Sequence, residues 1–264
     1  MTNKTYNQGN HYDKVDFVKG PAIYSSAELY DAMYNLGFFF PRTEPFLVMD
    51  AMCGKGLVGK EMSTRLKRDE IPHEMHFLDV GEGNLKKLQE DGYKTCRASV
   101  TDRIPYDDGA LDRLYCRFGV KNYSKDGQEK ILREFLRLLK KGDIFVLTDM
   151  EAPETAYGWM QDERRKKHTL GGIGGSAPHI PTRKMWYQML ADSGFEPKGD
   201  SETVSYVTTD EWVKSNQMTE NALREMNAWL LKSPENAKRA LNIREENGKV
   251  RIDYPVVVIS AAVK

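Results

Sequence analysis

Residues 46–60 read FLVMDAMCGKGLVGK, an apolar run that ends in an acid and passes through two glycines into a helical pattern. The run 46–50 has the length and composition of a buried strand, and 57–67 has the periodicity of a helix. Gly54 and Gly56 lie between them, where glycine lets the backbone turn tightly and approach a ligand at a helix N-terminus. The stretch therefore predicts a binding loop at the carboxyl edge of an α/β sheet.

Asp79 supports this prediction, because it ends the next apolar run 23 residues after Gly56. Nucleotide-binding βαβ units place an acidic residue about 20 residues beyond the loop, where its carboxylate holds ribose hydroxyls. The alternative is that Asp79 caps the helix that follows it.

Apolar and amphipathic segments alternate along the rest of the chain, as they do in a parallel sheet covered by helices. The sequence predicts a doubly wound, Rossmann-like α/β fold with a seven-stranded sheet. The expected strands are 46–50, 75–79, 93–98, 111–118, 143–149, 203–207 and 254–263, and the expected helices are 57–67, 84–91, 125–140 and 182–193.

Three segments depart from this alternation. Residues 1–45 precede the sheet as an N-terminal arm or lid, and 150–181 and 209–249 are insertions in the main domain, 46–264. Long insertions at sheet loops are usually functional lids, so we expect mainly helical caps, although they could merely pad the fold.

Single residues of the insertions are less distinctive. The glycine run 171–175 predicts a hinge of the cap, and Trp212 and Met218 are expected nearest to the substrate pocket. The basic run 164–167 is expected to be a solvated helix face.

Charge and hydropathy exclude several classes of protein. Lys plus Arg and Asp plus Glu both number 39, so the chain lacks the basic excess of a nucleic-acid binder. No apolar run reaches the roughly 20 residues that span a bilayer, and the polar N-terminus has no signal-peptide core. We expect a cytoplasmic protein without an integral membrane segment, with a homodimer left open as its assembly. Three cysteines without CxxC spacing, Cys53, Cys96 and Cys116, predict reduced thiols and no metal site.

The loop at 50–56 resembles the first motif of the class I methyltransferases that depend on S-adenosylmethionine (SAM), with Met52 in place of the first glycine. Residues 98–150 are similar to the ubiquinone and menaquinone biosynthesis C-methyltransferases within that superfamily. The elements that carry this likeness are Ile104-Pro105-Tyr106, Leu111-Asp112, FGVKN at 118–122 and LKKG at 139–142. The resemblance covers 46–150 and fails across both insertions.

The resemblance implies that SAM is the cofactor and assigns its contacts by position. Gly54 and Gly56 would face the methionine moiety, Asp79 the ribose, and Ser99 with Val100 the adenine. Ser99 departs from the family, which has an acid there. The remaining positions expected at the cofactor are Tyr12, with Tyr30 as a second candidate for the same role, Asp50, Met52, Val80, Arg117 and Phe118.

Lys121 and Asn122 stand where the related enzymes have an Arg-Asn pair associated with the hydroxyl of the quinol acceptor. A buried lysine has a readily lowered pKa, so Lys121 would act as a base or favour an ionised acceptor. The alternative is a solvated lysine beside a turn asparagine. Further candidates for proton transfer are Tyr123, His168 and His179.

These observations predict an enzyme that transfers a methyl group from SAM to a small aromatic or hydrophobic acceptor, at carbon or oxygen. Two other classes are open, an NAD(P)-dependent Rossmann oxidoreductase and a non-catalytic SAM-binding protein. The absence of a GxGxxG register and the presence of FGVKN argue against the oxidoreductase.

Overall fold

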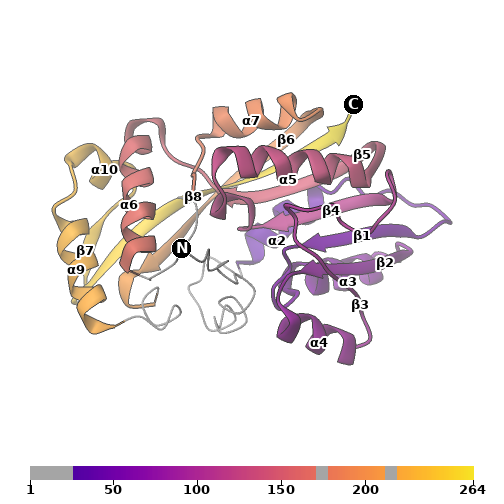
Figure 1. The fold of residues 1–264 in the computed structure, drawn as a ribbon, viewed down its shortest axis with the longest axis horizontal. Coiled ribbons are helices and arrows are strands. Elements are labelled where there is room, and N and C mark those ends of the chain that lie inside the picture. Colours follow the sequence, from indigo (N-terminus) through magenta and orange to yellow (C-terminus); the bar gives the residue numbers. More distant parts are fainter. Residues whose placement is uncertain (1–25, 171–177, 212–218) are drawn as a thin grey trace, which may run out of the picture.

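The fold was examined in a computed structural model, which describes residues 26–170, 178–211 and 219–264 (Figure 1). The expected Rossmann-like α/β fold is confirmed, and the sheet has the order β3-β2-β1-β4-β5-β8-β6. Strand β8 runs antiparallel to both of its neighbours, and the three-residue β7 pairs with it as an eighth strand that we did not expect. The strands are β1 (Phe46–Ala51), β2 (His73–Asp79), β3 (Lys94–Arg97), β4 (Leu111–Arg117), β5 (Leu139–Met150), β6 (Phe195–Thr208), β7 (Arg244–Glu246) and β8 (Lys249–Val263).

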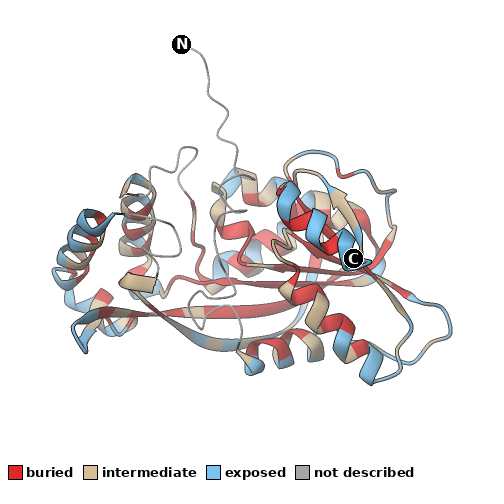
Figure 2. Ribbon diagram, turned by 90° about the horizontal axis from the view of Figure 1, so that it is seen from below, coloured by how far each residue is buried: buried red, intermediate tan, exposed pale blue. Residues whose placement is uncertain are grey.

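Helices cover both faces of the sheet and separate two apolar cores. Helices α2, α3 and α4 contribute to one core, and α5 and α7 to the other. Buried residues follow the central strands and the helix sides that face them (Figure 2). The helices of the described residues are α2 (Ala27–Asn35), α3 (Leu57–Arg68), α4 (Glu82–Glu90), α5 (Lys125–Leu138), α6 (Tyr157–Leu170), α7 (Arg183–Asp192), α9 (Glu220–Leu231) and α10 (Glu235–Ala240), with 3-10 turns η2 (Val120–Asn122) and η3 (Glu154–Ala156).

The central strands were predicted well because they are buried on both faces. Strands β1 and β4 lie under helices on each side, so almost every residue in them is buried. Such strands read as continuous apolar runs, which are easy to find in a sequence.

Strands β6 and β8 extend far beyond their predicted bounds. They pair from Phe195 opposite Val263 to Thr208 opposite Arg251, with one register shift between Pro197 and Gly199. Strand β6 is nearly three times its expected length, and β8 is half as long again as expected. In the first half of β8, buried residues alternate with more exposed ones, which is the pattern of a strand with one solvated face. This half lacks the continuous apolar run on which the prediction relied.

Strand β5 also begins earlier than expected, at Leu139, because the helix before it ends at Leu138. Leu139 pairs with Leu111, and the register then shifts before Ile144 pairs with Arg113. Gly142 lies between them with a φ of 84°, a backbone conformation that suits glycine.

The described parts of the two insertions form one helical lobe on the long ends of β6 and β8, beside the main sheet (Figure 1). The rings of Trp159 in α6 and Trp229 in α9 stack with their centroids 5.1 Å apart. Asn236 Nδ2 in α10 donates to the Thr155 carbonyl at 2.6 Å, and Lys166 pairs with Glu225. Segments separated by about 70 residues of chain therefore pack together, as a cap prediction requires.

Several expected features lie outside the described residues. These are the glycine run 171–175, Trp212, Met218 and Tyr12. Of the N-terminal arm, helix α2 is described, and it packs against α3 and against the antiparallel pair β6 and β8. Within the described parts of the chain, no helix is long and apolar enough to cross a membrane.

Candidate functional site

The candidate site lies where the loops after β1, β2 and β4 meet. Strand β1 pairs in parallel with both β2 and β4, with Ala51 opposite Leu78 on one side and Cys116 on the other. The carboxyl ends of the three strands therefore reach the same edge, which is where open α/β sheets bind ligands.

Asp79 joins two of these loops through its carboxylate. Its Oδ2 accepts from the Gly54 N–H and its Oδ1 from the Gly81 N–H, both at 2.8 Å. Helix α4 is capped by Gly81, so Asp79 is not its capping residue. A carboxylate offers about four lone-pair sites, so the side chain of Asp79 is chemically suited to accept from ligand hydroxyls.

The two glycines of the loop after β1 have different roles. Gly54 has a φ of 50° and open space where a Cβ would point, so its backbone borders the edge of the sheet. A Cβ on Gly56 would instead lie 2.7 Å from Leu88 and 2.8 Å from the Phe77 ring. The bare side of Gly56 therefore faces the core, and close packing explains this glycine.

Met52 occupies the position of the family's first glycine and adopts a left-handed backbone, with a φ of 58°. Its sulfur lies 3.8 Å from the Cys116 Sγ. A Cβ on Gly119 would come within 2.5 Å of the same sulfur, so the methionine fits because residue 119 has no side chain. The loop keeps the glycine-like conformation with a larger side chain.

Asp50 is buried beneath this loop. Its carboxylate accepts from the Gly59 N–H at 2.8 Å and so fixes the first turn of α3. Burial raises the pKa of Asp50 to about 7, against the opposing effects of that hydrogen bond and of the Arg117 charge. Arg117 Nη1 lies 3.3 Å from the Tyr30 hydroxyl of α2. Asp50 thus supports the loop from below.

Ser99 shapes the turn after β3. Its Oγ lies 2.8 Å from the Thr101 Oγ1 and accepts from the Thr101 N–H at 3.2 Å. Val100 is buried, and Val80 beside Asp79 is half-buried. The Ser99 hydroxyl is therefore partly engaged in the turn.

The loop after β4 is held by Lys121. Its Nζ donates to the Phe118 carbonyl at 2.5 Å and lies 3.6 Å from Asp149 Oδ1 at the end of β5. The Asp149 Oδ2 accepts from the Lys121 N–H at 3.0 Å, and Asn122 Nδ2 donates to the Phe118 carbonyl at 3.0 Å. Lys121 is only 6% exposed, so the solvated-lysine alternative is wrong.

The environment of Lys121 lowers the pKa of its amine. Burial lowers its pKa to about 8, although the Asp149 carboxylate acts in the opposite direction. Phe118 has a φ of 55°, which turns its carbonyl toward Lys121 and Asn122. The Lys121 ammonium therefore points into the protein, where it contacts the Phe118 carbonyl of its own loop and Asp149.

His179 connects three elements at the same edge. Its Nδ1 lies 3.0 Å from Gln128 Oε1 in α5, its Nε2 lies 3.1 Å from the Tyr157 hydroxyl in α6, and its N–H donates to the Tyr123 carbonyl at 3.0 Å. Burial lowers the pKa of His179, so the ring is neutral near pH 7.

His168 does not join this group. It lies in the last turn of α6, whereas Tyr157, the partner of His179, begins that helix. At 1.5 Å of rise per residue, the two ends of α6 are separated by about 16 Å. The structure therefore does not bring the two histidines together.

The basic run in α6 contains residues that sequence analysis misjudged. Lys167 is buried, not solvated, and its Nζ lies 2.5 Å from Glu163 Oε1 and 2.6 Å from the Tyr254 hydroxyl. Arg164 Nη2 donates to Asn122 Oδ1 at 3.2 Å. The i,i+4 spacing of Glu163 and Lys167 is equally common on solvated helices, so the sequence held no signal that this pair is buried.

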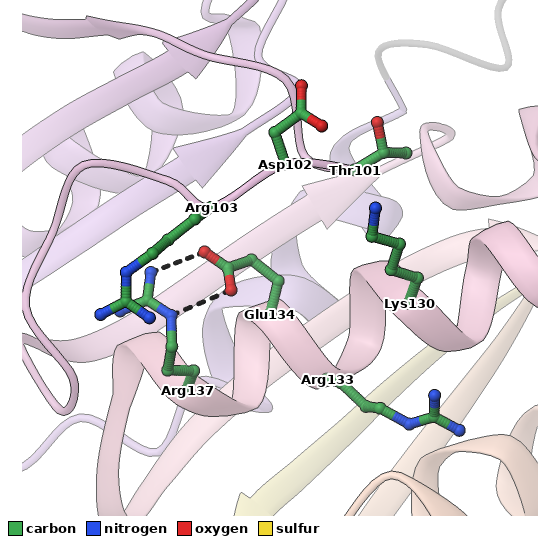
Figure 3. A pocket seen from close by; sticks show the side chains of 7 residues that line it. All are labelled: Thr101, Asp102, Arg103, Lys130, Arg133, Glu134 and Arg137. Carbon is green, nitrogen blue, oxygen red and sulfur yellow. Dashed lines mark hydrogen bonds and ion pairs between the residues drawn. The ribbon is translucent and has the colours of Figure 1, made fainter.

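A hollow of about 420 Å³ lies between the loop after β3 and helix α5 (Figure 3). Its lining is largely charged, and Arg137 is bound there to Glu134, to Asp108 and to the Ile104 carbonyl. These contacts anchor the segment that leads into β4. The lining residues are Thr101, Asp102, Arg103, Lys130, Arg133, Glu134 and Arg137.

No group of three His, Cys, Asp or Glu side chains among the described residues could hold a metal ion. The three cysteines are free thiols.

Comparison with known proteins agrees with this geometry. Residues 48–142 match the family model of a methyltransferase domain. The ubiquinone/menaquinone biosynthesis C-methyltransferase of Geobacter sp. (strain M21) is 26% identical over 110 residues, which cover 40% of this chain and 46% of that enzyme.

Two solved structures show the same fold. The YcgJ protein of Bacillus subtilis superposes with a TM-score of 0.73 at 17% identity, covering 90% of this chain and 99% of that one. The geranyl diphosphate C-methyltransferase of Streptomyces coelicolor A3(2), in complex with S-adenosylhomocysteine (SAH), has a TM-score of 0.52 at 15% identity and covers 91% and 80% of the two chains. Residues 48–142 thus match a methyltransferase domain, the chain has the fold of these solved structures, and part of it is similar in sequence to a ubiquinone/menaquinone biosynthesis C-methyltransferase, of which it spans about half the length.

Proposed function

We propose that this protein transfers a methyl group from SAM to a small aromatic or hydrophobic acceptor, at carbon or oxygen. The observation that carries the proposal is the Asp79 carboxylate, which holds the Gly54 backbone at the edge where the loops after β1, β2 and β4 converge. The C-methyltransferase relative supports a quinol-like acceptor.

The residues at this edge fit the chemistry of SAM. Asp79 offers carboxylate lone pairs to the ribose hydroxyls, and the uncovered backbone at Gly54 allows close approach of the methionine part. Ser99 and Val100 would border the adenine, with a hydroxyl and an apolar side chain. Arg117 ends β4 and Phe118 follows it, and both would lie where SAM and the acceptor meet.

When bound, SAM supplies an electrophilic methyl group on a sulfonium. Transfer forms one bond from the acceptor atom to the methyl carbon, breaks the carbon–sulfur bond, and removes one proton from the acceptor. The protein must align the acceptor and exclude water. Lys121 places positive charge behind the Phe118 carbonyl, and neutral His179, with Tyr157 on its Nε2, is suited to take the proton.

We also propose that the helical lobe closes over this edge. Its helix α6 contacts the edge directly, through Tyr157 at His179 and Arg164 at Asn122. Closure would exclude water from the reacting groups.

The strand order disfavours the oxidoreductase alternative. Dinucleotide-binding Rossmann sheets have the order 3-2-1-4-5-6 with parallel strands. Here the antiparallel β8 stands between β5 and β6. A non-catalytic SAM-binding protein would have the same binding site but would not transfer the methyl group.

Turnover is therefore the test. The purified chain is incubated with SAM carrying a deuterated methyl group and a panel of catechols, hydroxybenzoates and alkylated quinols, and SAH and labelled products are measured by mass spectrometry. The proposal predicts stoichiometric SAH and label transfer to at least one compound, and loss of both in Asp79→Ala. SAH binding without transfer to any compound would favour the non-catalytic alternative.

A further inference from the structure

Arg164 of helix α6 reaches from the helical lobe to the loop after β4. Its Nη2 donates to Asn122 Oδ1 at 3.2 Å, and its Nε is buried without a hydrogen-bond partner. No carboxylate of the described residues forms an ion pair with its guanidinium within 4.0 Å. A buried donor without a partner is costly in a folded protein and calls for an explanation.

The charges around Arg164 do not balance. Lys121 pairs with Asp149, and Lys167 pairs with Glu163, so each of the two buried carboxylates already has a cation. Arg164 lies close to both lysines, because it donates to Asn122, the neighbour of Lys121, and precedes Lys167 by one turn of α6. Among the described residues of this cluster, the guanidinium of Arg164 is therefore left without a carboxylate of its own.

The charge of Arg164 cannot be removed by proton loss, because a guanidinium stays protonated in proteins. The Nε of Arg164 is buried although the side chain as a whole is partly exposed, and an anionic oxygen would supply the missing hydrogen-bond acceptor. The planar fork of arginine suits the two oxygens of a carboxylate or phosphate.

We propose that Arg164 binds the methyl acceptor, and that the acceptor carries a negatively charged oxygen, which binds at Arg164 and Asn122. The inference rests on the proposed methyltransferase function and specifies its substrate class. The shared chemistry is an anionic oxygen on a small aromatic or hydrophobic molecule, whether carboxylate, phosphate or phenolate. Arg164 is thus a specificity-determining residue supplied by the helical lobe.

The experiment titrates simple probes into the full chain saturated with SAH. Benzoate and phenyl phosphate represent two anionic classes, phenol titrated above and below its own pKa represents the third, and benzamide is the neutral match for benzoate. Binding is measured by calorimetry at constant ionic strength. We expect at least one anion to bind about tenfold or more tightly than its neutral form, since a charge-assisted hydrogen bond contributes at least one decade of affinity.

Arg164→Met should abolish this preference, and Arg164→Lys should keep part of it, because lysine retains the charge but not the fork. The matched control is Arg165→Met, which removes the neighbouring exposed arginine paired with Asp162 and should leave the preference unchanged. The SAH affinity and near-ultraviolet circular dichroism of each variant show whether its fold is intact.

Two results would overturn the inference while the proposed function stands. The first is normal SAH binding with no preference for any anion, and the second is a preference that survives Arg164→Met. Failure of SAH itself to bind would overturn the proposed function instead, so the two failures are distinguishable.

Discussion

Replacing Lys121 by methionine should destabilise the protein strongly, because the change leaves a buried carboxylate without its cation. Asp149 is fully buried, and the Lys121 ammonium 3.6 Å away is its ion-pair partner. Removing one member of a buried pair costs about 3–5 kcal/mol. Asp149 keeps two backbone N–H donors, from residues 121 and 150, which place the expected loss near the lower limit, about 3 kcal/mol.

The loss should also depend on pH. Burial already raises the pKa of Asp149, and the Lys121 charge opposes that rise. Without Lys121 the pKa of Asp149 rises further, so the folded state takes up a proton and loses less stability in mildly acidic solution. Urea unfolding of Lys121→Met should therefore show a smaller deficit at pH 5 than at pH 8.

The double variant Lys121→Met with Asp149→Asn is the decisive control. It removes both charges, and most of the lost free energy of unfolding should return. A deficit below about 1 kcal/mol in Lys121→Met, equal at both pH values, together with no recovery in the double variant, would refute the inward ion pair.

Three further predictions follow from other parts of the structure. Asp50→Asn should remove a pH dependence of the free energy of unfolding. With a pKa raised from 3.8 to about 7, Asp50 adds stability that is fully present below pH 3.8 and is lost as pH rises through about 7. Urea unfolding of the wild type and the variant between pH 4 and 8 detects this difference. Gly59→Ala should cost about 1–3 kcal/mol, because its Cβ would lie 2.8 Å from an atom of the Phe77 ring, whereas Gly158→Ala, with nothing within 4 Å, should be neutral or stabilising; equal thermal unfolding of the two variants would contradict this. Trp229→Ala should speed amide hydrogen exchange in α6 and α9 without affecting the central strands, because it removes the stacked ring that joins these helices; uniform exchange rates across the chain would show that the lobe is not a separate unit.

The main sheet could be predicted from sequence because each of its central strands is marked by an apolar run within the strand itself. Strands β1, β2 and β4 are buried on both sides and are bounded by an acid or glycine, so hydrophobicity alone locates them. The same loops indicated Asp79 and Gly54, because a parallel strand delivers its last residue to the carboxyl edge.

The parts that escaped prediction depend on contacts between distant segments. Nothing near Lys121 in sequence shows that its ion-pair partner is Asp149, 28 residues away on the next strand. Likewise Lys167 is buried by Tyr254, 87 residues further along the chain. The pairing of β4 with β5 brings Lys121 to Asp149, and the long strand β8 brings Tyr254 to Lys167. Neither contact is visible in the apolar runs of the sequence.

Gly56 shows a third kind of limit. Its motif position predicted contact with the cofactor. In the structure, the side chains of Phe77 and Leu88 fill the space that a Cβ on Gly56 would need. A glycine pattern records that a side chain is excluded, and sequence alone does not say whether a ligand or the core excludes it.

The central claim is that the edge formed by β1, β2 and β4 binds SAM through Asp79. Isothermal titration of SAH into the wild-type chain and into Asp79→Ala, with NADH as the competing ligand class, tests it most directly. We predict saturable one-site binding of SAH, no binding of NADH, and an affinity for SAH at least about tenfold weaker in Asp79→Ala, since the variant loses charge-assisted hydrogen bonds to the ribose and to Gly54. Binding of NADH in preference to SAH, or an SAH affinity unchanged by Asp79→Ala, would contradict the account.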